Sequence, residues 1–228
     1  MAKLSKKMQK ACEGIDLKKI YPIEEAVKLA QKTSISKFDG SIDVAIKLNL
    51  DTTKAEQQLR GTLSFPHSNG KVLRILALDN DIKAADAKAA GADFFGGSEI
   101  LQDIEKGLTD FDVILTTPKM MPSLSKLGKV LGPKGLMPNP KTGTVSQDLI
   151  KTIKEFKKGK FEYRTDTFGN IHMTVGKVSS KPSEVTENIE TLITLIKSKR
   201  PSTVKGIYIQ NISVCASMGP GIKVQIPN

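Results

Sequence analysis

The segment Ile42-Asp43-Val44-Ala45-Ile46-Lys47-Leu48-Asn49-Leu50 places a large aliphatic residue at every even position. Successive side chains of a β-strand point to opposite faces, so this alternation predicts a strand that buries one face and leaves the other in polar surroundings. The same period of two returns far along the chain, in residues 171–175 and 222–226. Both ends of the chain therefore contribute the same type of strand.

Two amphipathic segments accompany these strands. One follows Pro22 and is expected to form a helix over residues 23–33, and the other follows Pro182 and is expected to form a helix over residues 183–199. Proline is favoured in the first turn of a helix, and apolar residues recur at helical spacing along the second segment. The outer parts of the chain therefore combine strands with helices.

The domain organisation follows from the size of these outer parts. Segments of roughly 65 to 70 residues bury little surface separately. We therefore expect residues 1–66 and 160–228 to build one discontinuous α+β domain, with residues 67–159 inserted as a second domain.

Residues 67–159 show a different pattern, in which strands alternate with helices. Apolar runs at Val72–Leu78 and Phe111–Thr117 predict buried strands, and Gly91–Phe95 predicts a turn into another short strand. Helices are expected around residues 82–90, 99–107 and 147–158. This alternation is typical of a parallel α/β sheet with helices packed on its faces.

The charge of the chain favours a polyanionic partner. Lys and Arg number 35 against 24 Asp and Glu, the formal net charge is +11, and the isoelectric point is near 9.5. Nucleic acid and an anionic membrane both fit this charge. The sequence has no apolar run of about 18 residues and no apolar signal-peptide region after Met1, which disfavours a membrane partner. We expect a soluble cytoplasmic protein.

Motifs for catalysis or for a metal or cofactor site are missing from the sequence. Cys12 and Cys215 lie far apart without a CxxC motif, so we expect them to be reduced. The only histidines are His67 and His172, with no HExxH motif and no Gly-x-Ser-x-Gly elbow, and Lys141 follows a proline where a phosphate-binding loop needs glycine. The sequence therefore predicts neither an enzyme nor a cofactor.

Residues 128–145 form the longest unusual segment. Four glycines and three prolines argue against a helix or a central strand there, and Lys129, Lys134 and Lys141 add positive charge. The composition fits a rigid connection with solvated lysines as well as it fits a phosphate contact. Both interpretations stay open.

Two short segments are candidates for contact with RNA. In Ser217-Met218-Gly219-Pro220-Gly221 the glycines permit close approach of a backbone, the serine hydroxyl can meet a ribose 2′-OH, and methionine can lie against a base. A plain turn between two strands is the alternative. In Lys37-Phe38-Asp39-Gly40-Ser41 the phenylalanine either stacks on a base or closes the core.

Three segments together resemble the bacterial ribosomal protein L-one family. They are Leu131-Gly132-Pro133-Lys134-Gly135-Leu136-Met137-Pro138-Asn139-Pro140-Lys141, Arg60-Gly61-Thr62-Leu63-Ser64-Phe65-Pro66-His67 and Ser217-Met218-Gly219-Pro220. The resemblance runs nearly from end to end. It implies a domain built from both termini that binds large-subunit rRNA, and an inserted Rossmann-like three-layer α/β domain.

The resemblance also implies partners and site residues. The protein would be a monomer when free, form the mobile stalk beside the tRNA exit site, assist release of deacylated tRNA, and repress translation by binding its own operon mRNA. The RNA contacts implied at matching positions are Lys37, Phe38, Ser41, Ser217, Met218 and Gly219. The polar strand face and the glycine segment add His172, Thr174, Pro220 and Gly221 as candidates, and the loop lysines Lys129, Lys134 and Lys141 are a possible secondary contact.

Some positions depart from the family pattern. Ser217 stands where threonine is usual, which keeps a hydroxyl and loses a methyl group, and Asn211 stands where serine is common. Phe65 and Ser68 replace leucine and glycine in the expected hinge around Pro66-His67, so hinge stiffness is expected to differ.

Two other functions are considered beside ribosomal RNA binding. The middle domain would serve an α/β enzyme or small-ligand binder if its sheet carried a cleft at the strand ends, as parallel sheets often do. A free regulator of messenger RNA would use the same surface as the ribosomal protein.

Overall fold

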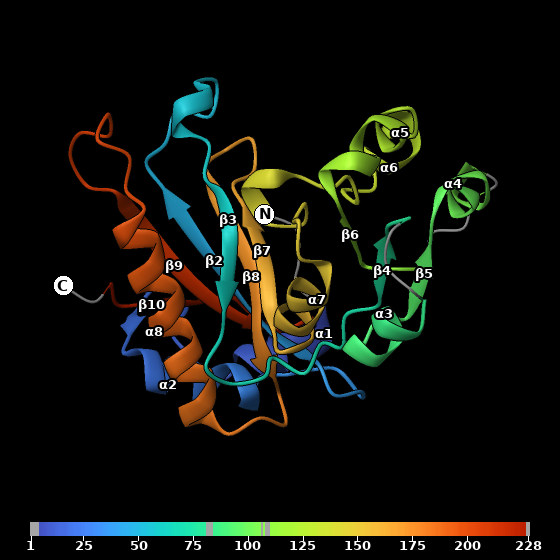
Figure 1. Ribbon diagram of the computed structural model, residues 1–228. Helices are drawn as coiled ribbons and strands as arrows, with labels where there is room; N and C mark the ends of the chain where they lie inside the picture. Colours follow the sequence, from blue (N-terminus) through green and yellow to red (C-terminus); the bar gives the residue numbers. More distant parts are fainter. Residues whose placement is uncertain (1–4, 81–83, 106, 108–109, 227–228) are drawn as a thin grey trace. The chain divides into compact units, whose positions relative to one another are not determined.

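The structure is a computed structural model that describes residues 5–80, 84–105, 107 and 110–226, and the chain packs as two compact units (Figure 1). Unit 1 comprises Met1–Gly70 and Tyr163–Asn228, and unit 2 comprises Lys71–Glu162. From the sequence alone, the two domain boundaries are predicted to follow residue 66 and residue 159. The mixed α and β composition expected from the sequence is confirmed in both units.

Unit 1 contains a five-stranded sheet in the order β1-β10-β9-β2-β8. Strand β2 lies between β8 and β9 and pairs antiparallel with both, and only β1 pairs in parallel, with β10. The strands are β1 (Ile20–Tyr21), β2 (Ser41–Leu48), β8 (Asn170–Lys177), β9 (Ile209–Ala216) and β10 (Ile222–Val224). Strands from the first and last parts of the chain are therefore neighbours in one sheet.

The alternation predicted for the central strand is present. Ile42, Val44, Ile46 and Leu48 are each no more than 1% exposed, and the residues between them are half-buried on the opposite face. The strand ends at Leu48 rather than at residue 50, because its register with β9 shifts there. One face of the sheet thus belongs to the core of unit 1.

Two helices pack on the buried face of this sheet, α2 (Ile23–Lys32) and α8 (Pro182–Ser198) (Figure 1). Val185, Ile189, Leu192 and Ile196 form a buried stripe along α8. Burial of each such side chain contributes roughly 1.5 to 3 kcal/mol. Both helices begin and end within one residue of the predicted positions.

Several short elements of unit 1 are not predicted by the sequence. They include helix α1 (Lys6–Cys12), the 3-10 helix η1 (Ala55–Gln57) and a two-stranded sheet of β3 (Arg60–Ser64) with β7 (Lys160–Arg164), which crosses the division between the units. Strand β7 has a single buried residue, Tyr163, so it lacks the alternation that marks the longer strands.

The segment around His67, expected to be a hinge, is bonded to the rest of unit 1. The Asn188 side chain accepts a hydrogen bond from the His67 N–H (3.2 Å) and donates to the His67 carbonyl (3.2 Å) and the Val175 carbonyl (2.8 Å). His67 Nε2 lies 2.7 Å from Glu187 Oε2, and Asn69 Nδ2 donates to the Thr174 carbonyl (3.3 Å). Asn188 is 1% exposed, so the three bonds of its side chain are shielded from water, whereas the contact between His67 and Glu187 is exposed.

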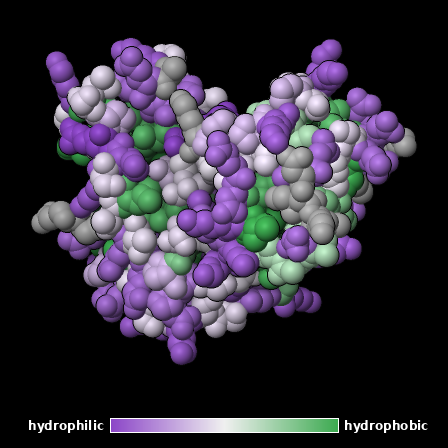
Figure 2. Space-filling view, viewed as in Figure 1, coloured by the Kyte–Doolittle hydropathy of each residue, from purple (hydrophilic) through white to green (hydrophobic). Residues whose placement is uncertain are grey.

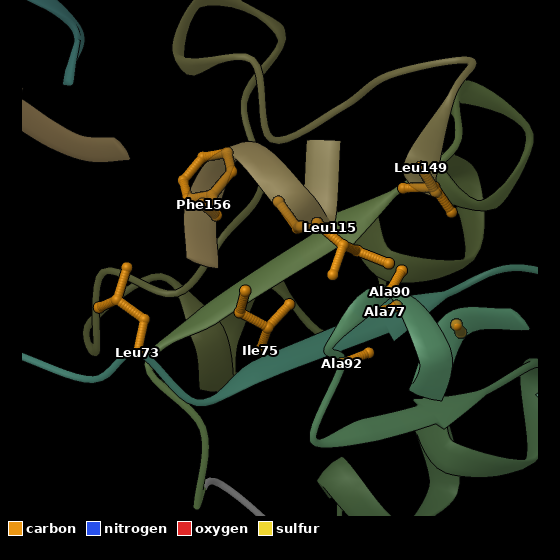
Figure 3. Packing of buried hydrophobic residues seen from close by; sticks show 10 residues of the cluster. Leu73, Ile75, Ala77, Ala90, Ala92, Leu115, Leu149 and Phe156 are labelled. Carbon is orange, nitrogen blue, oxygen red and sulfur yellow. The ribbon is translucent and has the colours of Figure 1, made fainter. Parts of the chain in front are cut away.

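Unit 2 is a three-layer arrangement around a parallel sheet in the order β5-β4-β6. Helices α3 and α7 share one core cluster with the sheet, while α4, α5 and α6 contribute to a second cluster on the other face. Figure 3 shows the first cluster, with Phe156 and Leu149 of α7 near Leu115, Ile75 and Ala77 of the strands. The elements are β4 (Ile75–Leu78), α3 (Ala84–Ala90), β5 (Phe94–Gly96), α4 (Ser98–Glu105), β6 (Val113–Thr116), α5 (Met121–Ser125), α6 (Gly128–Leu131) and α7 (Leu149–Lys157).

The structure corrects two predictions for unit 2. Strand β4 begins at Ile75 rather than Val72, whose side chain is 79% exposed. The segment 128–145 contains helix α6 and a 3-10 helix, η3 (Pro140–Thr142), although it was expected to exclude a helix. The prolines lie after α6 or at the first residue of η3, where a missing N–H costs little, and buried Leu131 anchors the α6 turn.

The surface visible in Figure 2 is largely hydrophilic, and hydrophobic residues reach it in small separate groups. Among the described residues, no helix has the length and apolar character needed to cross a bilayer.

Candidate nucleic-acid interface

Ser217 ties the two candidate RNA-binding segments together at one end of the sheet. Its backbone N–H donates to the Ser41 carbonyl (2.9 Å), and its Oγ accepts from the Ser41 N–H (3.0 Å). Both segments continue from paired strands, since β2 begins at Ser41 and β9 ends at Ala216. The serine hydroxyl predicted to meet a 2′-OH therefore already has a partner inside the protein.

Glycine at position 40 permits this close approach. A Cβ placed on Gly40 would lie 3.0 Å from Ser36 Oγ and 3.2 Å from Ser217 Cβ. Any larger side chain would push the two segments apart. The Val178 N–H also donates to the Gly40 carbonyl (2.9 Å), so the segment is also held by the residue that follows β8.

The loop that carries Phe38 is held at three points. Ser36 Oγ donates to the Phe38 carbonyl (2.9 Å), and the Asp39 carboxylate accepts from the Ser179 N–H (3.1 Å) and from Ser179 Oγ (2.8 Å). The Phe38 ring is nevertheless 63% exposed. It does not close the core, so one of its two predicted roles is ruled out and the ring is left available for stacking.

Met218 has an unusual backbone. Its φ is +62°, and it is the only residue other than glycine with a positive φ in the described parts of the chain. A left-handed conformation costs an L-residue roughly 1 to 2 kcal/mol. The strained backbone presents a side chain that is 72% exposed. Because strained backbone conformations cluster at functional sites, Met218 is a candidate contact residue.

The residues after Met218 have different surroundings. The Gly219 N–H donates to the Ala216 carbonyl (2.8 Å), and a Cβ on Gly219 would approach that carbonyl oxygen to 3.2 Å. Pro220 is buried, and its predicted contact with RNA stays a prediction. A Cβ on Gly221 would meet no atom within 4 Å. Gly221 therefore faces open space and is not required for packing.

Cations surround this end of the sheet. Lys37 is exposed beside Phe38, and Lys177 Nζ lies 3.4 Å from Ser41 Oγ. Lys223 on β10 is also exposed but lies farther along the sheet, since it pairs with Ser213, which in turn pairs with Ala45. Positively charged side chains near an exposed aromatic ring and a thioether favour binding of a polyanion that also carries flat apolar groups.

His172 and Thr174 lie farther along the open face of the sheet. Thr174 Oγ1 donates to Asp43 Oδ1 (2.6 Å), and His172 Nε2 lies 3.6 Å from Asp166 Oδ2. Since His172 pairs with Ala45, it lies four residues along β2 from Ser41, or roughly 13 Å. The structure thus places His172 away from Ser41, whereas Thr174, which pairs with Asp43, lies nearer, two residues along β2 from Ser41.

Two titratable groups on or near the open face, the Asp166 carboxyl and the Cys215 thiol, have shifted pKa values. Burial raises the pKa of Asp166, but hydrogen bonds from Asn170 and from the Phe168 N–H outweigh it, so the pKa lies below its usual value. Burial and the nearby Asp43 carboxylate raise the pKa of the Cys215 thiol. A protonated thiol is a weak nucleophile. Both cysteines are free.

The three loop lysines belong to unit 2. Lys129 and Lys134 are exposed, and the side chain of Lys141 lies outside the described residues. Their predicted role as a secondary RNA contact stays a prediction.

Sequence reasoning missed residues that position the interface. Asp39 and Gly40 carry no signal of their own beyond lying next to Phe38, and Ser179 carries none because its partner lies 140 positions away. The left-handed backbone at Met218 also gave no signal, since methionine is rarely found in that conformation.

The chain is similar to known proteins over almost its whole length. Residues 29–220 match the family described as Ribosomal protein L1p/L10e family. The Large ribosomal subunit protein uL1 of Ureaplasma urealyticum is 61% identical over 228 residues, which covers 100% of both chains. Proteins of the same name are 60% identical over 224 residues in Mycoplasmoides gallisepticum, covering 98% of each chain, and 58% identical over 228 residues in Mycoplasma pneumoniae, covering 100% of each.

Proposed function

Because the chain belongs to the ribosomal protein L1p/L10e family, we propose that it binds large-subunit rRNA through the surface formed by residues 36–41 and 217–221, the Phe38–Met218 surface. It is a ribosomal protein and not an enzyme. Membership of this family argues against the alternative that the middle of the chain is an α/β enzyme.

The observation that carries this proposal is the pairing of two exposed, apolar side chains on a rigid frame. Phe38 and Met218 are 63% and 72% exposed, and the segments that carry them are joined by the bonds between Ser41 and Ser217. Because the backbone that carries them is already held in place, binding has to immobilise these side chains but not the segments themselves. The frame is therefore formed before the RNA arrives.

Binding on this surface combines two kinds of contact. Lys37 and Lys177 supply phosphate attraction, which makes affinity fall as salt rises. Phe38 and Met218 supply stacking and close packing against unpaired bases or sugars, with stacking worth roughly 1 to 3 kcal/mol for each base. Shape and stacking then provide the specificity, because phosphate contacts carry no sequence information.

The finer roles follow from this binding mode. The protein would form the mobile stalk of the large subunit beside the tRNA exit site and assist release of deacylated tRNA. A messenger RNA that folds like the rRNA site would occupy the same surface, which gives a route to repression of its own operon. Both roles need the Phe38–Met218 surface to recognise a folded RNA rather than a linear sequence.

The test uses Gly221, because a side chain there clashes with nothing inside the protein. Gly221→Glu places a carboxylate on the proposed surface without disturbing the fold. Gln225→Glu adds the same charge at an exposed position after β10 and serves as the control. Affinity for a folded large-subunit rRNA fragment is measured for both variants over a range of salt concentrations.

The expected result is a loss of at least tenfold for Gly221→Glu at every salt concentration, and a small loss for Gln225→Glu that disappears at high salt. Equal affinities of the two variants at high salt would show that RNA does not approach Gly221, and the proposed surface would have to be abandoned.

A further inference from the structure

A second exposed apolar site lies at the opposite end of β9 from Ser217. It is a pocket with a volume of about 360 Å³ lined by Lys197, Arg200, Ile207, Tyr208, Ile209 and Ile226. Strand β9 separates the two ends by eight residues, which correspond to roughly 26 Å. This pocket is therefore not part of the Phe38–Met218 surface.

The pocket has an apolar wall that nothing in the described chain covers. Ile207 is 77% exposed, whereas Tyr208 and Ile209 beside it are buried. A large aliphatic residue at the rim of an apolar pocket is a common feature of sites that receive another apolar side chain. The volume is close to the lower end for binding pockets, so it suits one or two side chains rather than a large ligand.

Arg200 provides a fixed cation at the same place. Its Nη2 donates to the Val204 carbonyl (2.9 Å) and the Gly206 carbonyl (3.0 Å), and its guanidinium lies 5.9 Å from the centre of the Tyr208 ring. These contacts fix the guanidinium and the loop that leads to Ile207. Because a guanidinium carries five N–H groups, Nη1 and Nε keep donors that a carboxylate can accept from.

The segment that forms much of the pocket is positively charged. Lys197, Lys199, Arg200 and Lys205 fall within nine residues, and no Asp or Glu occurs between Glu190 and the last residue of the chain. A partner that binds here therefore needs negative charge next to an apolar group.

RNA satisfies the charge but not the shape of this pocket. Stacking of a base needs an exposed flat ring, and the Tyr208 ring is only 6% exposed. The isoleucines that line the pocket offer aliphatic contacts instead. We propose that the pocket, which we call the Ile207 pocket, binds an acidic peptide segment of a protein partner that inserts one aliphatic side chain beside Ile207 and places a carboxylate on Arg200.

The test titrates the full-length protein with blocked peptides while the isoleucine methyl signals are followed by NMR. The probes are an alternating Glu-Leu peptide, a Glu-Ser peptide of equal charge, a Lys-Leu peptide and a single-stranded RNA oligonucleotide. We expect the Glu-Leu peptide to shift the Ile207, Ile209 and Ile226 signals in a saturable way, with an affinity at least tenfold above that of Glu-Ser.

Two variants complete the experiment. Ile207→Ser is expected to weaken the Glu-Leu affinity about tenfold, which corresponds to about 1.4 kcal/mol. Ile20→Ser removes an isoleucine that is 61% exposed elsewhere in unit 1 and is expected to leave the affinity unchanged. Both positions are exposed, so neither change should unfold the protein.

Three outcomes would overturn the proposal. Equal binding of Glu-Leu and Glu-Ser would show that charge alone acts, tighter saturable binding of the RNA oligonucleotide at these methyl groups would assign the pocket to RNA, and equal effects of the two variants would show nonspecific binding. None of them bears on rRNA binding at the Phe38–Met218 surface.

Discussion

Ser41 and Ser217, which lie 176 positions apart in the sequence, are joined through both the backbone and the side chain of Ser217. Strand β2 begins at Ser41, and the neighbouring strand β9 ends at Ala216, just before Ser217. The loop with Phe38 and the turn with Met218 consequently start from the same point of the sheet. The candidate RNA surface depends on this junction.

Loss of the Ser217 hydroxyl should weaken both the fold and RNA binding. Ser217→Ala leaves the half-buried Ser41 N–H without its acceptor, at a cost of roughly 1 kcal/mol in the free energy of unfolding. Ser217→Thr keeps the oxygen and should retain parent-like stability. Urea denaturation of the two variants measures the difference, and equal stability would mean that the hydroxyl contributes nothing to the junction.

Substitution of Met218 should separate stability from function. Met218→Gly removes the strain of the left-handed backbone, so the free energy of unfolding should stay unchanged or rise by up to about 1 kcal/mol. The same change removes the exposed side chain and should weaken rRNA affinity. Denaturation and RNA titration are measured on the same preparation. A variant that loses stability yet keeps its affinity would contradict both parts.

Phe38 should affect RNA binding and leave stability intact. Phe38→Ala is expected to lower affinity for folded rRNA by roughly 1 to 3 kcal/mol if the ring stacks on a base. Its stability should change by less than about 0.5 kcal/mol because the ring is exposed. Phe168→Ala, at a ring that is 74% exposed, is the matched control. Equal losses in both variants would point to nonspecific contact.

Asn188 should hold the segment around His67 on unit 1. Asn188→Ala leaves the His67 N–H and two carbonyls without partners, and we expect a loss of roughly 2 kcal/mol in the free energy of unfolding. Hydrogen exchange of the His67 amide should become faster. Unchanged exchange at this amide would show that other contacts fix the segment.

We also propose that the two units are separate domains. A chain in which a short glycine-serine linker replaces residues 71–159 should fold cooperatively and retain rRNA affinity within about threefold, because the five-stranded sheet and the β3–β7 pair are complete without them. Circular dichroism and RNA titration of this chain give the answer. Failure to fold would show that unit 1 needs unit 2.

Strands and helices were predictable where a local sequence pattern shows which side chains are buried. The alternation at Ile42–Leu48 and the helical stripe along α8 record which side chains meet the core, so strand and helix follow from the sequence. Strands β3 and β7 carry too few buried residues for such a pattern. Helix α6 was missed because glycines and prolines were judged by composition, whereas their positions within the segment decide their effect.

The candidate interface was predictable only in part. Phe38 and Met218 could be named from the family resemblance, but their fixation depends on Asp39 with Ser179 and on Ser41 with Ser217, which are contacts between distant parts of the chain. The burial of Pro220 was not predictable, because a turn proline carries no sequence signal for the side it faces. Such features follow from tertiary packing.

Photocrosslinking within assembled large subunits tests the central claim most directly. A photoreactive amino acid replaces Met218 in one preparation and Glu190, on the helical face of unit 1, in another. The account predicts crosslinks from position 218 to a small set of rRNA nucleotides and none to RNA from position 190. Crosslinks from position 218 to protein alone, or equal RNA crosslinking from both positions, would contradict it.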